Sequence, residues 1–307
     1  IDFQERGASY FLFGFELLTF ILWMAGQGDE APACDELLAE TAKSDRDTLK
    51  FVACIGLDLS EHEEAWLTDD VLSIYCRARP TQQERIDLMQ SALKWRIEKR
   101  DILTSPVCPT CAADCCSHDA RIFGCDRDGD PVMMNCFQLP RDLSPANLDR
   151  HMICLFERAI KEFPVDPDRA LDPTDGHRCV RQWTWIIDLY GFGVRHSDPR
   201  TTKNLITLLQ TAYRGRLKKM ILLDSPKGFE SFFETVAKPF MKPHTSARIE
   251  FVTYQNAPQR LGEVLGEQLA KSLLEEAAET RSEAWEAKTW RTFYGGSYIP
   301  VATACCG

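Results

Sequence analysis

The residues with the clearest potential for metal chemistry are the cysteines between positions 108 and 118. Cys108 and Cys111 are separated by two residues, and two further cysteines and His118 follow in the same segment. Thiolate and imidazole groups at this spacing can close a tetrahedral zinc site, and neighbouring thiols can also form a redox disulfide. The spacing is too tight for the usual paired-knuckle zinc pattern, so we expect no metal and unliganded thiols. A disulfide is one alternative, and the other is zinc held by Cys108, Cys111, Cys115 and Cys116.

The sequence shows no pairing of a nucleophile with a base. Its six histidines lie in scattered polar contexts, and it contains no Gly-x-Ser-x-Gly, no His-Glu-x-x-His and no glycine-rich phosphate loop. We therefore expect that the protein is not an enzyme and requires no cofactor.

Length and charge limit the class of protein further. A chain of 307 residues with 44% hydrophobic residues can bury one large core, or a core and a small helical subdomain. The net charge of −10 argues against nucleic acid as a partner. Residues 200–248 differ, because ten Lys or Arg against three acids give this stretch a charge of +7. Such a basic stretch suits an anionic membrane surface or a lipid phosphate, or is simply a solvated surface.

The cysteine content and an apolar segment bear on localisation. Thirteen cysteines at irregular spacing do not resemble a secreted disulfide framework, and they indicate a reducing compartment such as the cytosol or an organelle stroma or matrix. Tyr10–Ala25 is apolar on all sides and contains Glu16 as its only charge. It spans 16 residues, whereas a transmembrane helix needs about 20. We expect this segment to dock on a protein partner or on the core, with a membrane anchor as the alternative.

The order of apolar patterns predicts an α/β fold. Apolar residues recur at three and four positions between residues 35 and 100, which indicates helices, and Thr68 and Thr81 are suitable helix starts. Residues 105–119 read as a loop. Short β-rich runs alternate with helical patterns after that point, which is typical of a parallel sheet flanked by helices. The predicted strands are 121–125, 131–136, 183–189, 220–223 and 248–254, and the predicted helices are 148–163, 202–213, 230–241 and one or two helices from 261 to 290.

Three segments carry a resemblance to a known family. Leu67–Leu103 contains Arg-Ala-Arg and Trp-Arg at the ends of two helices, and Arg121–Phe137 contains an Asp-x-x-Gly-x-Pro-Val turn. Trp185–Val252 contains Asp188-Leu-x-Gly, a Ser225-Pro-x-Gly-Phe turn and a Lys-Pro-Phe-Met segment before a basic residue and Ile. In this order the segments resemble the CRAL-TRIO lipid-binding family, which includes the phosphatidylinositol and phosphatidylcholine transfer proteins.

This resemblance implies a division of the chain and a lipid pocket. The predicted parts are a hydrophobic N-terminal segment (1–30), a helical subdomain (31–104), a CRAL-TRIO domain (105–260) and an acidic helical C-terminal extension with a tail (261–307). Members of the family carry one hydrophobic molecule between the sheet and a mobile lid helix. The residues expected to form the lid and the pocket are Phe229, Phe232, Phe233, Val236, Phe240, Met241, Met133 and Ile187. The alternative is that these are ordinary core residues.

The headgroup positions of the family are altered in this chain. The Tyr-Pro-Glu-Arg turn of phosphoinositide-binding members reads Tyr-Arg-Gly-Arg here, so Gly215 replaces the glutamate. Arg248 keeps the basic position before the next strand, and we expect Arg248 and Arg216 to contact a phosphate. The choline-binding tyrosine is replaced by Met133, and Gly193 and Arg195 replace hydroxyl residues. A less usual lipid, a prenyl- or carotenoid-like molecule, or a pocket that no longer exchanges a ligand are the remaining options.

The expected function is binding, and transfer, of a single lipid at an anionic membrane surface. The alternative is a structural subunit of a larger membrane-associated assembly, which would contact its partners through Tyr10–Ala25 and the C-terminal helix. A module that binds small GTPases is a third reading, and it rests on fold analogy alone.

Overall fold

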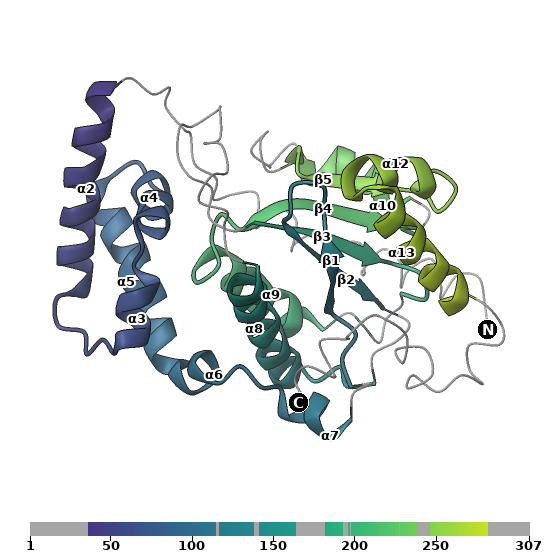
Figure 1. Ribbon diagram of the computed structural model, residues 1–307, viewed down its shortest axis with the longest axis horizontal. Coiled ribbons are helices and arrows are strands. Elements are labelled where there is room, and N and C mark those ends of the chain that lie inside the picture. Colours follow the sequence, from purple (N-terminus) through teal and green to yellow (C-terminus); the bar gives the residue numbers. More distant parts are fainter. Residues whose placement is uncertain are drawn as a thin grey trace.

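The computed structural model joins a bundle of helices to a five-stranded sheet with helices on both faces (Figure 1). It describes residues 36–114, 117–137, 141–163, 182–192, 196, 198–226, 228–238 and 246–281. For residues 36–43, 199, 202, 206, 232, 236 and 237 it describes the backbone but not the side chains. Across these ranges no helix combines the length and the apolar character that a bilayer span requires. The segment Tyr10–Ala25 lies outside the described residues.

The N-terminal subdomain is helical, as the spacing of apolar residues predicts. Thr68 begins α4 by accepting a hydrogen bond from the amide of Val71, and Thr81 begins α5 through a capping box with Glu84. These two starts are therefore confirmed. Leu72 and Leu93 are among the residues that form the buried centre of the bundle. The helices are α2 (Glu36–Cys54), α3 (Glu61–Trp66), α4 (Asp69–Arg77), α5 (Gln82–Glu98) and α6 (Arg100–Thr104).

The sheet contains all five predicted strands in the order of the chain. β1 pairs with β2 in antiparallel fashion, and the remaining neighbours are parallel. The strands are β1 (Arg121–Cys125), β2 (Pro131–Cys136), β3 (Trp183–Asp188), β4 (Leu217–Leu223) and β5 (Ile249–Val252). The β1–β2 turn needs Gly129 in a left-handed conformation, with a φ of 76°, and the Asp126 carboxylate accepts the amides of Asp128 and Asp130.

Two groups of helices cover the two faces of the sheet (Figure 1). α8 (Pro145–Glu162), α9 (Pro199–Gln210) and the segment formed by α10 (Phe229–Phe232) and η2 (Phe233–Ala237) pack on one face. We call this face the lid face, after the lid that the sequence resemblance predicts on this side. α12 (Ala257–Leu265) and α13 (Glu267–Thr280) pack on the opposite face. The short helix α7 (Pro109–Ala113) lies in the segment that we predicted to be a loop.

Asp188, the first residue of the Asp-Leu-x-Gly motif, ties the C-terminal helix to the sheet. It ends β3 and accepts two hydrogen bonds from the Arg281 guanidinium, at 2.7 and 2.8 Å. The same guanidinium lies over the rings of Tyr190 and Tyr254, at 4.6 and 4.4 Å from their centroids. These contacts hold the end of α13 against the carboxyl ends of the strands. The apolar residues of α13 therefore pack on the sheet as part of its core.

The helical subdomain is joined to the α/β part by buried polar contacts. Arg96 of α5 lies 3.3 Å from the Glu157 carboxylate of α8, and Glu157 also accepts the Tyr213 hydroxyl at 2.7 Å. Gly215 has a φ of 74°, and a Cβ placed there would lie 3.2 Å from the Ile74 side chain. Glycine at position 215 thus suits a backbone conformation that other residues rarely adopt, and a larger residue there would press on the Ile74 side chain.

Candidate functional site

The lid face of the sheet presents two rows of side chains that run across the strands. The residues in each row are partners in the strand register, so their side chains point to the same face. The first row consists of Met133, Trp185, Met220 and Ile249, and the second of Asn135, Ile187, Leu222 and Phe251. All but Asn135 and Phe251 are buried. The two rows form a broad apolar floor beneath α8, α9 and α10.

The segment above β5 contributes two aromatic side chains to this floor. Gly228 starts the segment with a φ of 84°, which explains why the Ser-Pro-x-Gly-Phe turn carries glycine at this position. Phe229 and Phe233 are buried, and their ring centroids lie 5.7 and 5.1 Å from that of Phe251. The predicted amphipathic helix is here one short α-helical turn followed by a π-helical turn, a geometry that is often found at functional sites.

The structure brings four of the eight predicted pocket residues together. Phe229, Phe233, Met133 and Ile187 belong to one buried cluster on the lid face. Phe232 and Val236 are described by their backbone alone, and Phe240 and Met241 lie outside the described residues. Burial in one cluster is expected both for residues around a ligand and for ordinary core residues. The pocket itself therefore stays a prediction.

Sequence reasoning missed a polar pair within this apolar floor. The indole N–H of Trp185 donates to the side-chain oxygen of Asn135 at 2.7 Å. Asn135 interrupts the otherwise apolar run of β2, and this interruption is the signal that could have revealed it. Near the other end of the floor, Phe156 of α8 stacks on Trp183 with ring centroids 4.7 Å apart. The floor is thus mainly aliphatic, with aromatic rings at a few positions and one hydrogen-bonded polar pair in it.

The two predicted phosphate ligands lie at the starts of neighbouring strands. Arg216 precedes β4 and is buried beside Tyr213, and burial lowers its pKa to about 10 although the Glu157 carboxylate favours the charged form. Arg248 precedes β5 and is half-buried, and its guanidinium donates to the carbonyl oxygen of Leu217 at 3.0 Å. Their role as phosphate ligands stays a prediction.

Comparison with known proteins agrees with this architecture. The family model described as the CRAL/TRIO domain matches residues 120–275, which is about half of the chain. The chain belongs to the CRAL/TRIO family. Among solved structures, a similar chain is that of "Crystal structure of Sfh5", with 18% sequence identity over 76% of this chain and 85% of that chain, and a TM-score of 0.49. No curated protein matches the chain significantly.

Membership of the CRAL/TRIO family defines the general type of the protein. This family consists of lipid-binding carriers rather than enzymes, and its domain is of the lipid-binding and lipid-transfer type. The matched residues extend from just before β1 into α13, so they include the whole sheet and the helices on both of its faces. The lid face therefore lies within the residues that match the CRAL/TRIO family model.

Among the described residues, six of the ten basic side chains of residues 200–248 are paired with acids or buried. Lys218 contacts three carboxylates of the β1–β2 turn, and Lys219 pairs with Glu250. Arg200 and Lys238 also form ion pairs, with Asp198 and Glu234 respectively. The guanidinium groups of Arg214 and Arg216 are buried. The net charge of +7 is thus a poor guide to the charge that a membrane would meet.

Two of the four cysteines considered as zinc ligands lie in a buried group with two histidines. Cys108 and Cys111 approach His118 and His151, whereas Cys115 and Cys116 lie outside the described residues. Hydrogen bonding by Cys111, His118 and His151 lowers the pKa of the Cys108 thiol well below its ordinary range, although burial opposes this shift. Sequence reasoning missed His151 because it lies on α8, 40 residues after Cys111, and no local spacing connects the two.

Proposed function

We propose that this protein binds a single lipid, or another elongated hydrophobic molecule, between the floor of the lid face and the α10–η2 segment, and transfers it at a membrane surface. The observation that carries the proposal is the position of Phe229 and Phe233, which cover Phe251 at the β5 edge of an apolar floor. This arrangement lies within the residues that match the CRAL/TRIO family.

The shape of the covering segment supports a lid. A diacyl lipid contains about thirty methylene groups, and removing each from water is worth about 0.8 kcal/mol, so the ligand must be covered during transfer. α10 is four residues long and continues into a π-helical turn of five residues. A segment of this kind has fewer regular hydrogen bonds than a long α-helix, so local opening of it costs less free energy.

The floor also limits the kind of ligand. It is mainly aliphatic with a few aromatic rings, and the Trp185–Asn135 hydrogen bond already satisfies its main polar groups. Because Met133 and Gly215 replace the family's choline and inositol contacts, we expect a ligand whose affinity comes mainly from its hydrocarbon part. Arg248, at the start of β5, would supply one phosphate contact for a phospholipid.

The test is lipid extraction followed by a transfer assay. Purified full-length protein is extracted with organic solvent, the extract is identified by mass spectrometry, and uptake of fluorescent lipid from vesicles is measured. We expect one lipid per chain. Recovery of no lipid, together with no uptake from phospholipid, prenyl-lipid or carotenoid-containing vesicles, would reject the proposal.

Neighbouring residues of β3 provide a matched pair of variants. Ile187 faces the lid and Ile186 faces α12 and α13, and both are buried isoleucines of one strand. Replacing Ile187 by Trp should fill space used by the ligand and reduce uptake at least about tenfold, a loss of about 1.4 kcal/mol in binding. Ile186→Trp should disturb packing to a similar extent without blocking the ligand. Equal loss of uptake in folded forms of both variants would count against a site on the lid face.

One observation favours the second candidate function, that of a structural subunit. Phe51 in the last turn of α2 and Ile55 directly after this helix are four positions apart, and they are 73% and 60% exposed. Large apolar side chains at this spacing form a stripe that suits contact with another protein. Co-purification with other proteins at a constant ratio in high salt, lost in a Phe51→Ser/Ile55→Ser variant, would support this candidate.

A further inference from the structure

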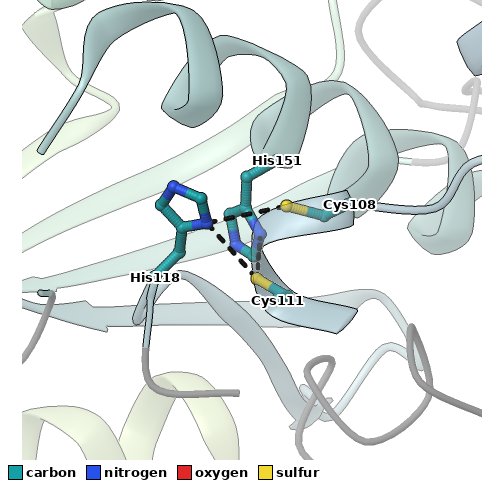
Figure 2. A group of neighbouring side chains, drawn as sticks. All are labelled: Cys108, Cys111, His118 and His151. Carbon is teal, nitrogen blue, oxygen red and sulfur yellow. Dashed lines mark hydrogen bonds between the residues drawn. The ribbon is translucent and has the colours of Figure 1, made fainter. Parts of the chain in front are cut away.

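Four potential metal ligands converge between α7, α8 and the start of β1 from three separate parts of the chain. Cys108 immediately precedes α7 and Cys111 lies within it, His118 lies in the segment before β1, and His151 lies on α8. All four residues are buried, and their ligand atoms lie within 4.8 Å of one another. Figure 2 shows the two sulfur atoms and the two imidazole rings directed toward a common centre.

The separations of these atoms match those of ligands that share one zinc ion. With Zn–S and Zn–N bonds of about 2.3 and 2.0 Å, a tetrahedral ion places sulfur and nitrogen about 3.5 Å apart. The Sγ atom of Cys111 lies 3.3 Å from the Nδ1 atoms of both His118 and His151. The Sγ atom of Cys108 lies 3.6 Å from His118 Nδ1. These distances surround the ideal value, so a small outward shift of the side chains would admit the ion.

The Nε2 atoms of His151 and His118 point away from the cysteines and lie near oxygen atoms. Histidines that bind a metal through Nδ1 commonly have such partners at Nε2. His151 Nε2 lies 2.7 Å from the carbonyl oxygen of Ala120, which accepts a hydrogen bond from it. That bond leaves Nδ1 without a proton and aimed at Cys111. His118 Nε2 is buried and lies 3.9 Å from the Asp142 carboxylate, the type of group that commonly orients a zinc-bound histidine.

Charge balance also favours a divalent ion. Two thiolates and two neutral imidazoles around Zn²⁺ sum to zero charge, which is what a fully buried site requires. Four protein ligands leave no open position, so the site would be structural rather than catalytic. An iron–sulfur cluster with two histidines on one iron and two cysteines on the other does not fit, because Cys111 approaches both histidines as a ligand of the same ion would.

We propose that Cys108, Cys111, His118 and His151 bind one structural zinc ion. The ion joins α7 to α8 and to the segment that enters β1, so it fixes the connection between the helical subdomain and the edge of the sheet. This proposal replaces the expectation of unliganded thiols, and it does not depend on whether the lid face binds lipid.

The other cluster of potential ligands among the described residues does not carry such a proposal. Asp126, Asp128 and Asp130 of the β1–β2 turn group their carboxylates, but the ammonium of Lys218 lies among them at 2.6 to 3.0 Å. The lysine already supplies the positive charge at that position.

The first test uses the unmodified full-length protein. Zinc is measured by mass spectrometry of metals after dialysis against a weak chelator, and metal-free protein is then titrated with zinc chloride and, separately, with cobalt chloride. We expect one equivalent of zinc per chain and a cobalt complex with the visible absorption of a tetrahedral site with two thiolates. Failure of metal-free, folded protein to bind zinc in competition with the weak chelator, or a cobalt spectrum of octahedral type, would overturn the proposal.

Variants then assign the ligands. Cys111→Ser should lower the affinity for zinc at least a hundredfold, because it removes the sulfur nearest both histidines. Cys125→Ser is the matched control, since Cys125 is exposed on β1, and it should retain one full equivalent. His151→Gln should retain cobalt thiolate absorption but lose the tetrahedral pattern. Full zinc affinity in both Cys111→Ser and His151→Gln would show that the metal binds elsewhere and would overturn the assignment.

Discussion

Glu157 lies in a polar cluster that joins the helical subdomain to the α/β part. Its carboxylate is paired with Arg96 at 3.3 Å and accepts the Tyr213 hydroxyl at 2.7 Å, and it lies close enough to Arg216 to favour the charged guanidinium. Arg96 in turn lies over the Trp66 ring at 4.7 Å. A buried charge of this kind is tolerated only while its partners remain in place.

Removal of the Glu157 charge should therefore destabilise the protein strongly. Glu157→Gln leaves Arg96 and Arg216 without their anionic partner, and we expect the free energy of unfolding to fall by about 3 kcal/mol. Glu162→Gln is a control on the same helix, because Glu162 forms an exposed pair with Arg158 four residues away, and it should cost less than about 1 kcal/mol. Urea unfolding followed by circular dichroism measures both. Similar small effects of the two variants would contradict this role of Glu157.

Glu63 gives the helical subdomain a defined sensitivity to acid. Burial alone would raise the pKa of this carboxyl, but hydrogen bonds from Arg100 and Ser60 outweigh that effect and lower the pKa to about 2. Because the pKa in the folded state lies below the unfolded value of about 4.3, Glu63 stabilises the fold above that pH. This stabilisation declines as the pH falls from about 4.3 toward about 2.

A comparison of Glu63→Gln with wild type should reveal this dependence. We expect the variant to be less stable near neutral pH, and the difference to shrink steadily as the pH is lowered from about 5 to about 3. Glu64→Gln, at an exposed neighbouring position, should show no such trend. A difference that stays constant with pH would show that the Glu63 charge does not contribute in this way.

Some residue roles could be predicted from the sequence and others could not. The starts of helices at Thr68 and Thr81 were predictable because capping depends on neighbours within three residues. The approach of His151 to Cys111, and the contact of Gly215 with Ile74, were not predictable. Both contacts join elements that are distant in the chain, and contacts of this kind cannot be predicted from a single sequence.

At the scale of the elements, the acidic β1–β2 turn is stabilised by a lysine from a distant strand. Its three aspartates would repel one another, and Lys218 of β4 compensates this charge at distances of 2.6, 2.8 and 3.0 Å. Burial lowers the pKa of the Lys218 ammonium, but the three carboxylates outweigh it and raise the pKa above its ordinary value. The ion pairs thus connect the turn to β4, on the other side of β3.

Lys218→Gln should weaken this connection. We expect a loss of about 3 kcal/mol in the free energy of unfolding, because Asp126 and Asp130 are buried and would keep unbalanced charge. Lys219→Gln, which affects one half-buried pair with Glu250, should cost at most about 1 kcal/mol. Calcium should restore part of the loss in the Lys218 variant, because grouped carboxylates bind this ion, and should leave wild type unchanged. Equal losses in the two variants, with no response to calcium, would contradict this prediction.

The strands were more predictable than the segment that covers them. All five strands were predicted: β1 and β2 from alternation around an Asp- and Gly-rich turn, and β3, β4 and β5 from short apolar runs. The signal is clearest in β3, which is buried along its whole length. Residues 230–241 were predicted as one amphipathic helix, but the described part of this segment divides into α10 and a π-helical turn. Its hydrophobic pattern fits both forms, so the choice between them depends on packing against Phe251.

At the scale of the whole molecule, three connections hold the parts together. Glu157 joins the helical bundle to α8, Arg281 fixes the end of α13 to Asp188, and the proposed zinc ion joins α7 to α8 and the start of β1. None of these three connections includes a residue of the α10–η2 segment, whose Phe229 and Phe233 side chains pack on Phe251. This difference is what a carrier needs, because a rigid floor and frame permit one segment to open.

Native mass spectrometry of the purified full-length protein tests lipid binding most directly. We predict a single species whose mass exceeds that of the chain, with its zinc, by the mass of one lipid. Denaturation should release this mass, and incubation with vesicles of a second lipid should exchange it. A native mass equal to that of the protein and its metal alone, unchanged after incubation with each class of lipid, would contradict the proposal that this chain is a lipid carrier.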